Sequence, residues 1–168
     1  MPDLRKLTTE KRNSATMKLD EMTPYEIISI MNREDHNVIE AVHRALPDIE
    51  TAILWATESL RHGGRIIYIG AGTSGRLGVL DAVECPPTFG VPYDMVVGLI
   101  AGGAEAFVKA KEGAEDNQEL GRDDLKNINL CSKDIVIGLA ASGRTPYVIG
   151  ALRLSLIHIS EPTRLLSI

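Results

Sequence analysis

Three short runs of aliphatic and β-branched residues recur along the chain, and they constrain its fold more than any other feature. They span residues 65–70, 95–100 and 134–139. Each has the length of a strand that is buried on both faces, and stretches with helical spacing separate them. Strands that alternate with helices favour right-handed crossovers and a parallel sheet with helices on both faces. The sequence therefore predicts an α/β fold.

Helices are expected between and before these strands. Helical patterns cover residues 77–83, 105–111 and 119–128, and a further helix begins at residues 146–152. Near the N-terminus, Thr23, Pro24 and Glu26 form a helix start with a capping box. Pro47 is expected to end this first helix and to separate it from a second one, which stops at the glycine pair 63–64. Residues 1–22 show no period and are expected to be extended.

Composition excludes several classes of partner. The net charge is -5 and only 4% of residues are aromatic, which argues against a nucleic-acid coat or an anionic membrane surface. No apolar run approaches the length that spans a bilayer. Cys85, Cys131 and four scattered histidines show no metal-ligand spacing. We therefore expect a soluble cytoplasmic protein with free thiols and without a bound metal.

Two loops that follow predicted strands look alike and are candidate phosphate sites. Residues 70–76 read Gly-Ala-Gly-Thr-Ser-Gly-Arg, and residues 140–145 read Ala-Ala-Ser-Gly-Arg-Thr. In an open parallel sheet, ligands bind beyond the carboxyl ends of the strands, where glycine and a helix start present N–H groups to an anion. The candidate phosphate-binding residues are Gly72, Thr73, Ser74, Gly75, Arg76, Ser142, Gly143, Arg144 and Thr145.

The first loop also fits the pattern G-x-G-x-x-G, so a dinucleotide site is an alternative. That site needs an acidic residue at the end of the second strand, where this chain has Ala-Gly-Gly at residues 101–103. Asp94 precedes the strand instead, and no Gly-Lys-Ser/Thr of a P-loop follows either loop. Tight strand-to-helix turns without any ligand are the remaining alternative.

Two carboxylates are candidates for acid–base chemistry. Glu84 lies in an apolar setting at a helix end, where burial would favour a protonated general acid. Glu115 stands beside other acidic residues, a pattern that is more typical of a solvated surface position than of a base.

Five strings together resemble the N-acetylmuramic acid 6-phosphate etherase family. They are residues 7–10 (Leu-Thr-Thr-Glu), 70–78 (Gly-Ala-Gly-Thr-Ser-Gly-Arg-Leu-Gly), 81–89 (Asp-Ala-Val-Glu-Cys-Pro-Pro-Thr-Phe), 113–116 (Gly-Ala-Glu-Asp) and 141–147 (Ala-Ser-Gly-Arg-Thr-Pro-Tyr). The resemblance runs to about Leu152. It implies a sugar isomerase (SIS) domain, which is a three-layer αβα sandwich and usually forms a homodimer.

The resemblance also implies a reaction. The D-lactyl ether of N-acetylmuramic acid 6-phosphate is cleaved by elimination and then hydration, which yields N-acetylglucosamine 6-phosphate and D-lactate. The family pattern implies that Glu84 is the acid and that Glu115 is the second catalytic carboxylate and the base. It implies no metal and no organic cofactor, and a role in recycling cell-wall sugar in the bacterial cytoplasm.

The expected organisation has three parts. Residues 1–46 form a lead-in and helix, residues 47–153 form part of a SIS domain, and residues 154–168 form a non-native tail. Because the family's pattern continues further, we expect an open sheet edge, poor folding and no activity for this chain alone. One helix would place Glu84 about 14 Å from the phosphate loop, so either the helix bends early or a partner subunit supplies Glu84. A phosphosugar sensor without catalysis and a phosphosugar isomerase remain alternatives.

Overall fold

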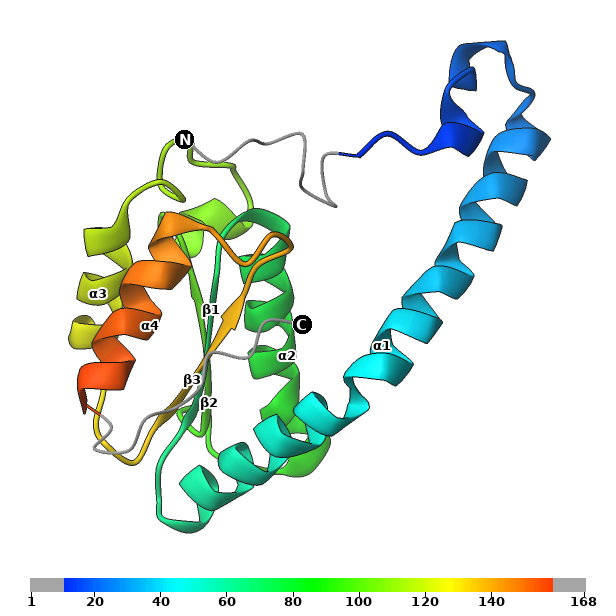
Figure 1. The fold of residues 1–168 in the computed structure, drawn as a ribbon. Helices are drawn as coiled ribbons and strands as arrows, with labels where there is room; N and C mark the ends of the chain where they lie inside the picture. Colours follow the sequence, from blue (N-terminus) through cyan, green and yellow to red (C-terminus); the bar gives the residue numbers. More distant parts are fainter. Residues whose placement is uncertain (1–10, 159–168) are drawn as a thin grey trace. The chain divides into compact units, whose positions relative to one another are not determined.

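The sheet consists of three parallel strands, as predicted. The computed structural model describes residues 11–158, and its strands are β1 (Ile66–Gly70), β2 (Val96–Ile100) and β3 (Ile135–Leu139). Their order is β2-β1-β3, so β1 is central, and each of the predicted strand ranges is confirmed to within one residue (Figure 1). The register pairs Ile66 with Val96 on one side of β1 and with Ile135 on the other.

Helices cover both faces of this sheet. Helix α2 (Gly72–Phe89) lies on one face, while α3 (Gln118–Asn127) and α4 (Pro146–His158) lie on the other (Figure 1). The main core forms on the second face. Ile67 and Ile69 both point to this face, because strand residues two positions apart lie on the same side of a sheet. This core is made of Ile67, Ile69, Ala101, Leu125, Tyr147, Val148 and Ala151. The chain is therefore an αβα arrangement, as expected.

Helix α2 packs unusually close to the sheet because glycine stands at the contacts. A Cβ on Gly78 would lie 2.8 Å from the Tyr68 Cβ, and a Cβ on Gly98 would lie 2.5 Å from the Val79 Cα. Real Cβ atoms do not approach so closely, so any larger residue would push the helix outward. The glycines therefore allow α2 to pack tightly against the middle of β1 and of β2.

A buried ion pair joins the starts of β1 and β3. The Asp134 carboxylate is 4% exposed and accepts hydrogen bonds from the Arg65 backbone N–H (2.9 Å), the Arg65 guanidinium (2.7 and 3.1 Å) and the Cys131 N–H (2.9 Å). Burial alone would raise the pKa of Asp134, but these hydrogen bonds from Arg65 and Cys131 outweigh it and lower the pKa. The pair therefore fixes the two strands from which the candidate phosphate loops depart.

The N-terminal region differs from its prediction in two ways. Residues predicted to be extended form two single-turn 3-10 helices, η3 (Ser14–Thr16) and η4 (Leu19–Glu21). The two predicted helices are one, because α1 runs from Pro24 to Arg61 with Pro47 inside it. Proline removes a single N–H donor, and a long helix can continue past that loss. The capping box is confirmed: the Thr23 N–H donates to Glu26 (2.8 Å) and the Glu26 N–H donates to Thr23 (3.3 Å).

The contact pattern divides the chain into two units, and it does so inside α1. The described residues of the first unit are 11–51, and those of the second are 52–158. Residues 52–61 of α1 belong to the second unit, where Ser59 donates a hydrogen bond to the Lys133 carbonyl (2.6 Å). None of the helices in the part that the structure describes has both the length and the apolarity to cross a bilayer.

Two further predictions about helices need correction. The helix expected at residues 105–111 is only a short 3-10 helix, η5 (Ala104–Phe107), after which the chain turns toward α4. At the other end, α4 extends to His158, so residues 154–158 of the predicted non-native tail are helical, and Ser155 is buried. The remainder of that predicted tail, residues 159–168, lies outside the described residues.

Candidate functional site

The two candidate phosphate loops leave the sheet at the same edge from neighbouring strands. Gly70, the last residue of β1, pairs with Leu139, the last residue of β3. Because the strands are parallel, both loops begin at the carboxyl edge of the sheet. The pairing of β1 with β3 therefore places the starts of the two loops side by side.

The first loop passes almost directly into α2. The helix begins at Gly72, so Ser74, Gly75 and Arg76 lie within its first two turns. A Cβ on Gly75 would lie 2.6 Å from the Gly70 carbonyl oxygen, which explains why glycine stands there. The N-cap residue, Ala71, makes no side-chain hydrogen bond to the helix start. The first N–H groups of α2 therefore lack a side-chain cap and suit an anion.

The second loop leads into a helix as well, but its triplet has a different conformation. Gly143 has φ +64°, and its N–H donates to the Ala140 carbonyl at 3.3 Å, so the triplet forms a turn ahead of α4. The start of α4 has few N–H donors to offer, because Pro146 has none and the Tyr147 N–H donates to the Glu115 carbonyl (3.0 Å). Its side chains are therefore the groups that can meet an anion, and Arg144 is exposed.

Arg76 differs from Arg144 in what its side chain does. Its Nε donates to the Phe107 carbonyl at 2.7 Å, and its Nη2 donates to the Ala106 carbonyl at 2.8 Å. These two carbonyls belong to the last residues of η5. Arg76 was predicted to bind phosphate, and in this structure its guanidinium fastens η5 to α2.

Glu115 lies at the same edge as the first loop. A cleft of about 200 Å³ is lined by Ala71, Gly72, Arg76, Ala101, Ala106, Ala110, Lys111, Glu112, Gly113, Ala114 and Glu115. The side chain of Glu115 is exposed, and its backbone carbonyl is the one that Tyr147 binds. The structure therefore brings Glu115 together with Gly72 and Arg76, although local sequence alone is typical of a surface residue.

Lys111 is a cleft residue that the sequence did not single out. Its ammonium group pairs with the Glu105 carboxylate at 3.1 Å, and its aliphatic chain lies over Gly102. No motif marks this lysine, because the loop residues Gly72 and Arg76 that share the cleft with it lie far away in the sequence. Lys111 adds a positive charge beside the phosphate loop.

Glu84 does not share the cleft. It follows Gly72 by twelve residues on the continuous helix α2, which separates the two by about 18 Å along the axis (Figure 1). In the single chain the side chain of Glu84 is exposed, so the burial that would favour a protonated acid is not present there. Leu77, Leu80 and Val83 on the same helix are also exposed, at 58%, 49% and 55%. The structure shows no early bend that would return Glu84 to the loops.

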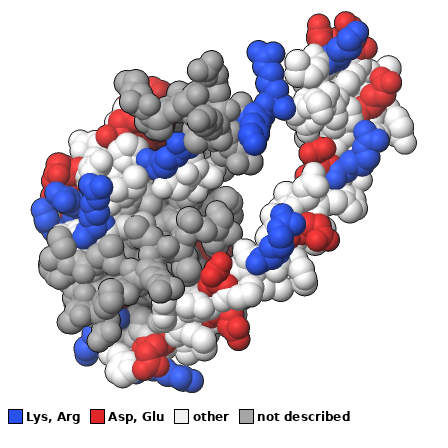
Figure 2. Space-filling model, viewed as in Figure 1, with Lys and Arg blue, Asp and Glu red and all other residues white. Residues whose placement is uncertain are grey.

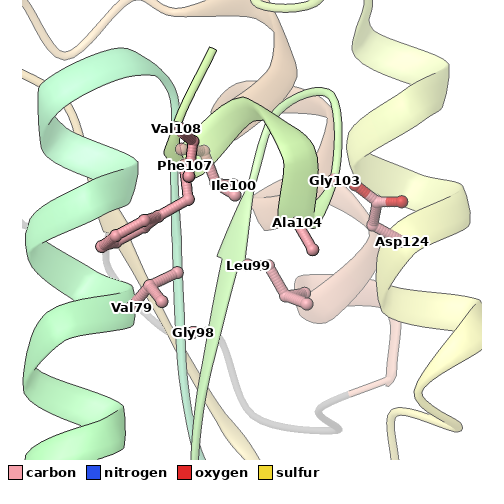
Figure 3. Close-up of a pocket in the computed structure, with 9 residues that line it drawn as sticks. All are labelled: Val79, Gly98, Leu99, Ile100, Gly103, Ala104, Phe107, Val108 and Asp124. Atoms are coloured by element: carbon pink, nitrogen blue, oxygen red, sulfur yellow. The ribbon is translucent and has the colours of Figure 1, made fainter. Parts of the chain in front are cut away.

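A larger cavity lies beside β2 and differs in chemistry (Figure 3). It has a volume of about 470 Å³ and is lined mainly by apolar residues of α2, β2 and η5, among them Val79 and Phe107. Among the described residues, the charged one in its lining is Asp124, which accepts a hydrogen bond from the Tyr147 hydroxyl at 2.7 Å. Burial and then this carboxylate raise the pKa of Tyr147. The residues given above for the smaller cleft include the basic side chains of Arg76 and Lys111, whereas the described lining of the larger cavity includes none, so the smaller cleft is the better phosphosugar site.

The surface charge that Figure 2 shows does not form a broad anion-binding field on this face. On the face that Figure 2 shows, basic and acidic side chains are interspersed. Within residues 11–158, no group of three His, Cys, Asp or Glu side chains gathers in a way that could hold a metal ion.

Comparison with known proteins agrees with this geometry. The family described as the glucokinase regulatory protein N-terminal SIS domain matches residues 48–156, which contain the sheet and both loops. Three curated relatives are each called N-acetylmuramic acid 6-phosphate etherase. The protein of Halalkalibacterium halodurans is 61% identical over 150 residues, that of Francisella tularensis subsp. tularensis 61% over 149, and that of Lactococcus lactis subsp. cremoris 62% over 152.

These matches cover 89%, 89% and 90% of this chain but only 50%, 51% and 51% of the relatives. The chain thus spans about half the length of the curated relatives that it matches. The expected family resemblance is confirmed, because the etherases match most of the chain at high identity and the family match covers the whole sheet. The parallel sheet, the paired loops and this match together show that the chain belongs to the SIS-domain family.

Proposed function

We propose that this chain carries the phosphosugar-binding part of an N-acetylmuramic acid 6-phosphate etherase. The observation that carries the proposal is the cleft that unites the first loop with Glu115, in a chain 61% identical to etherases. The substrate is N-acetylmuramic acid 6-phosphate, and the products are N-acetylglucosamine 6-phosphate and D-lactate. The reaction belongs to the recycling of cell-wall sugar, in the cytoplasm.

The phosphate group would be held by the two loops in different ways. The start of α2 offers the N–H groups of Gly72, Thr73 and Ser74, and the turn ahead of α4, which Gly143 shapes, offers the side chains of Ser142, Arg144 and Thr145. An exposed guanidinium such as that of Arg144 can bind a phosphate through two N–H groups at once. The helix start fixes the position of the phosphate, and Arg144 supplies the countercharge.

Glu115 would act as the base. In the open-chain sugar, the aldehyde acidifies the proton on C2, and the Glu115 carboxylate removes it. The electron pair then expels lactate from C3 while an acid protonates the leaving oxygen, and water adds across the resulting double bond. Net, one water is consumed, and no electrons are exchanged with a cofactor.

A second copy of the chain would supply the acid, Glu84. In a single copy, Glu84 lies about 18 Å along α2 from the phosphate loop, which is too far for one hexose phosphate. Small-molecule sites typically measure about 300–1,000 Å³, so a cleft of about 200 Å³ is small for the whole substrate. The exposed Leu77, Leu80 and Val83 beside Glu84 are suited to an interface. A homodimer that closes the cleft with Glu84 would meet both needs.

The first test is D-lactate release from N-acetylmuramic acid 6-phosphate. The assay compares this chain with the full-length chain that its source genome encodes around the same sequence. Release is expected from the full-length chain. Replacing Glu115 by Gln should lower kcat by at least about a hundredfold, because general base catalysis commonly contributes that much. Absence of lactate from both chains would refute the proposal.

A phosphosugar sensor is the second candidate, and the remote position of Glu84 in the single chain favours it. A sensor binds the sugar phosphate but releases no lactate. It would retain full affinity when Glu84 and Glu115 are both replaced by Gln. An isomerase would instead interconvert ketose and aldose phosphates, which the same reaction mixtures would show.

A further inference from the structure

The Arg76 guanidinium donates hydrogen bonds to two backbone carbonyls of η5, which indicates a structural role in addition to its place beside the phosphate loop. We propose that Arg76 is a positioning residue: it holds the segment that carries Glu115 in register with the phosphate loop. The assignment of Glu115 as base rests on the proposed function, whereas the holding of the segment rests on contacts alone.

The segment that follows β2 is anchored at both of its ends. At its beginning, Arg76 binds the carbonyls of Ala106 and Phe107 at 2.8 and 2.7 Å. At its end, the Tyr147 N–H binds the carbonyl of Glu115 at 3.0 Å. Between these anchors, Val108 is 81% exposed and makes little core contact. Ala114, next to Glu115, packs against the core, so the position of Glu115 depends on the two anchors together with this one contact.

Lys111 reinforces the first anchor. Its aliphatic chain lies so close to Gly102 that a Cβ there would be 3.0 Å from the Lys111 Cδ. Its ammonium group pairs with Glu105 of η5 at 3.1 Å. The Glu105 side chain is 83% exposed, so this ion pair adds little stability by itself. Arg76, which is half-buried, is the stronger link.

Arg76 also connects the two halves of the cleft. It lies one turn along α2 from the uncapped helix start, so it moves with the N–H groups that would hold phosphate. Its planar guanidinium can address two neighbouring carbonyls at once, which a lysine ammonium cannot do with fixed geometry. The distance between the phosphate and the Glu115 carboxylate would therefore be set through Arg76.

The decisive experiment is hydrogen exchange on the full-length chain from the source genome, with no ligand present. In Arg76→Ala, the amides of residues 104–109 should exchange at least about tenfold faster, because two charge-assisted hydrogen bonds are lost. Arg144→Ala is the matched control and should leave exchange in this segment unchanged. Arg76→Lys keeps the charge and should give an intermediate rate.

A titration with inorganic phosphate, followed by nuclear magnetic resonance, separates positioning from direct binding. Arg144→Ala should weaken phosphate binding by about tenfold, because a charged hydrogen bond is lost. Arg76→Ala should weaken it by less than about threefold, since the backbone donors remain. If Arg76→Ala loses as much affinity as Arg144→Ala while exchange is unchanged, Arg76 is a phosphate ligand and the proposal is wrong.

Kinetics give the third readout. Arg76→Ala should lower kcat for lactate release by about a hundredfold, because a base displaced by about 1 Å can cost that much. KM should change by less than about threefold. If even the unaltered full-length chain releases no lactate, the proposed function fails, while the exchange and phosphate measurements still decide the role of Arg76.

If Arg76→Ala does not fold, the proposal can still be tested on the unaltered protein by measuring the exchange of arginine Nε–H groups with solvent. The Arg76 Nε–H should exchange slowly with solvent, since the Phe107 carbonyl accepts from it. The Arg144 Nε–H is exposed and should exchange fast. Equal, fast exchange for the two arginines would overturn the proposal.

Discussion

Residues 74–76 and 142–144 carry the same three residue types, yet they occupy different places in the fold. The first triplet lies within the first turns of α2, and the second forms a turn ahead of α4. Gly75 is buried against the Gly70 carbonyl, whereas Gly143 has open space around it and φ +64°. Arg76 is tied to η5, and Arg144 is exposed.

The difference teaches that a helix start decides what a phosphate-type loop can offer. Where the helix begins early, its backbone N–H groups are available to an anion, and the arginine donates to the carbonyls of η5 instead. Where Pro146 delays the helix and its next N–H meets Glu115, the side chains of the turn must do the binding. The two Ser-Gly-Arg triplets therefore offer different groups to an anion. The variants below test this on the full-length chain from the source genome.

The largest effect is expected at Gly75. Gly75→Ala places a Cβ 2.6 Å from the Gly70 carbonyl oxygen and 2.8 Å from Ile100 Cγ1. Because both neighbours belong to the sheet, the helix must move, at a cost of about 3 kcal/mol in the free energy of unfolding. Urea denaturation measures this cost. A loss below about 1 kcal/mol would mean that α2 is less tightly seated than the structure indicates.

Loss of the Arg65–Asp134 ion pair, at the opposite edge of the sheet, should affect both loops equally. Asp134→Asn removes the charge that Arg65 binds and should lower the free energy of unfolding by about 2 kcal/mol. Hydrogen exchange should then rise to a similar extent in residues 70–76 and 140–145. An increase of exchange in only one loop would show that the Arg65–Asp134 ion pair does not stabilise the pairing of β1 with β3.

The Arg65–Asp134 ion pair also makes the stability of the folded protein depend on pH. The pKa of Asp134 is lowered in the folded state, so its contribution is fully present above the unfolded value of about 3.9. It is lost as the pH falls through the lower, folded pKa. The unaltered protein should therefore lose more stability below about pH 4 than Asp134→Asn does, in urea titrations across that range. Parallel curves would contradict this role of the ion pair.

A smaller effect is expected at Gly143. Gly143→Ala meets no neighbouring atom, but it forces an alanine into the left-handed region at a cost of about 1 kcal/mol. Thermal unfolding measures it beside Gly75→Ala. If the two glycine variants lose equal stability, the distinction between a steric and a conformational glycine is wrong.

The smallest effect is expected at Ser74. Its hydroxyl is one donor beside several backbone N–H groups, so Ser74→Ala should weaken binding of inorganic phosphate by about threefold. Arg144→Ala should weaken it more. The reverse ranking would move the main phosphate contact from the turn ahead of α4 to the side chains of α2.

Local chemistry in the sequence determined much of this molecule. The three strands, the stop of α1 at the glycine pair and the capping box of Thr23 and Glu26 follow from residue types that act on their near neighbours. The α/β class follows from their alternation. Local signals erred where a distant contact prevailed, as at residues 105–111, where Arg76 binds the end of a short η5 and the chain turns away.

Tertiary structure decided the make-up of the site. The central position of β1 places both loops at one edge, and the contact of α4 with the Glu115 carbonyl brings that residue to the cleft. The sequence left open whether the helix that carries Glu84 bends early, and the unbroken course of α2 decided that this exposed side chain lies far from the loops within one copy. Such relations join residues far apart in sequence. Periodicity describes the chain within a few turns, whereas strand order and helix packing depend on the whole folded chain.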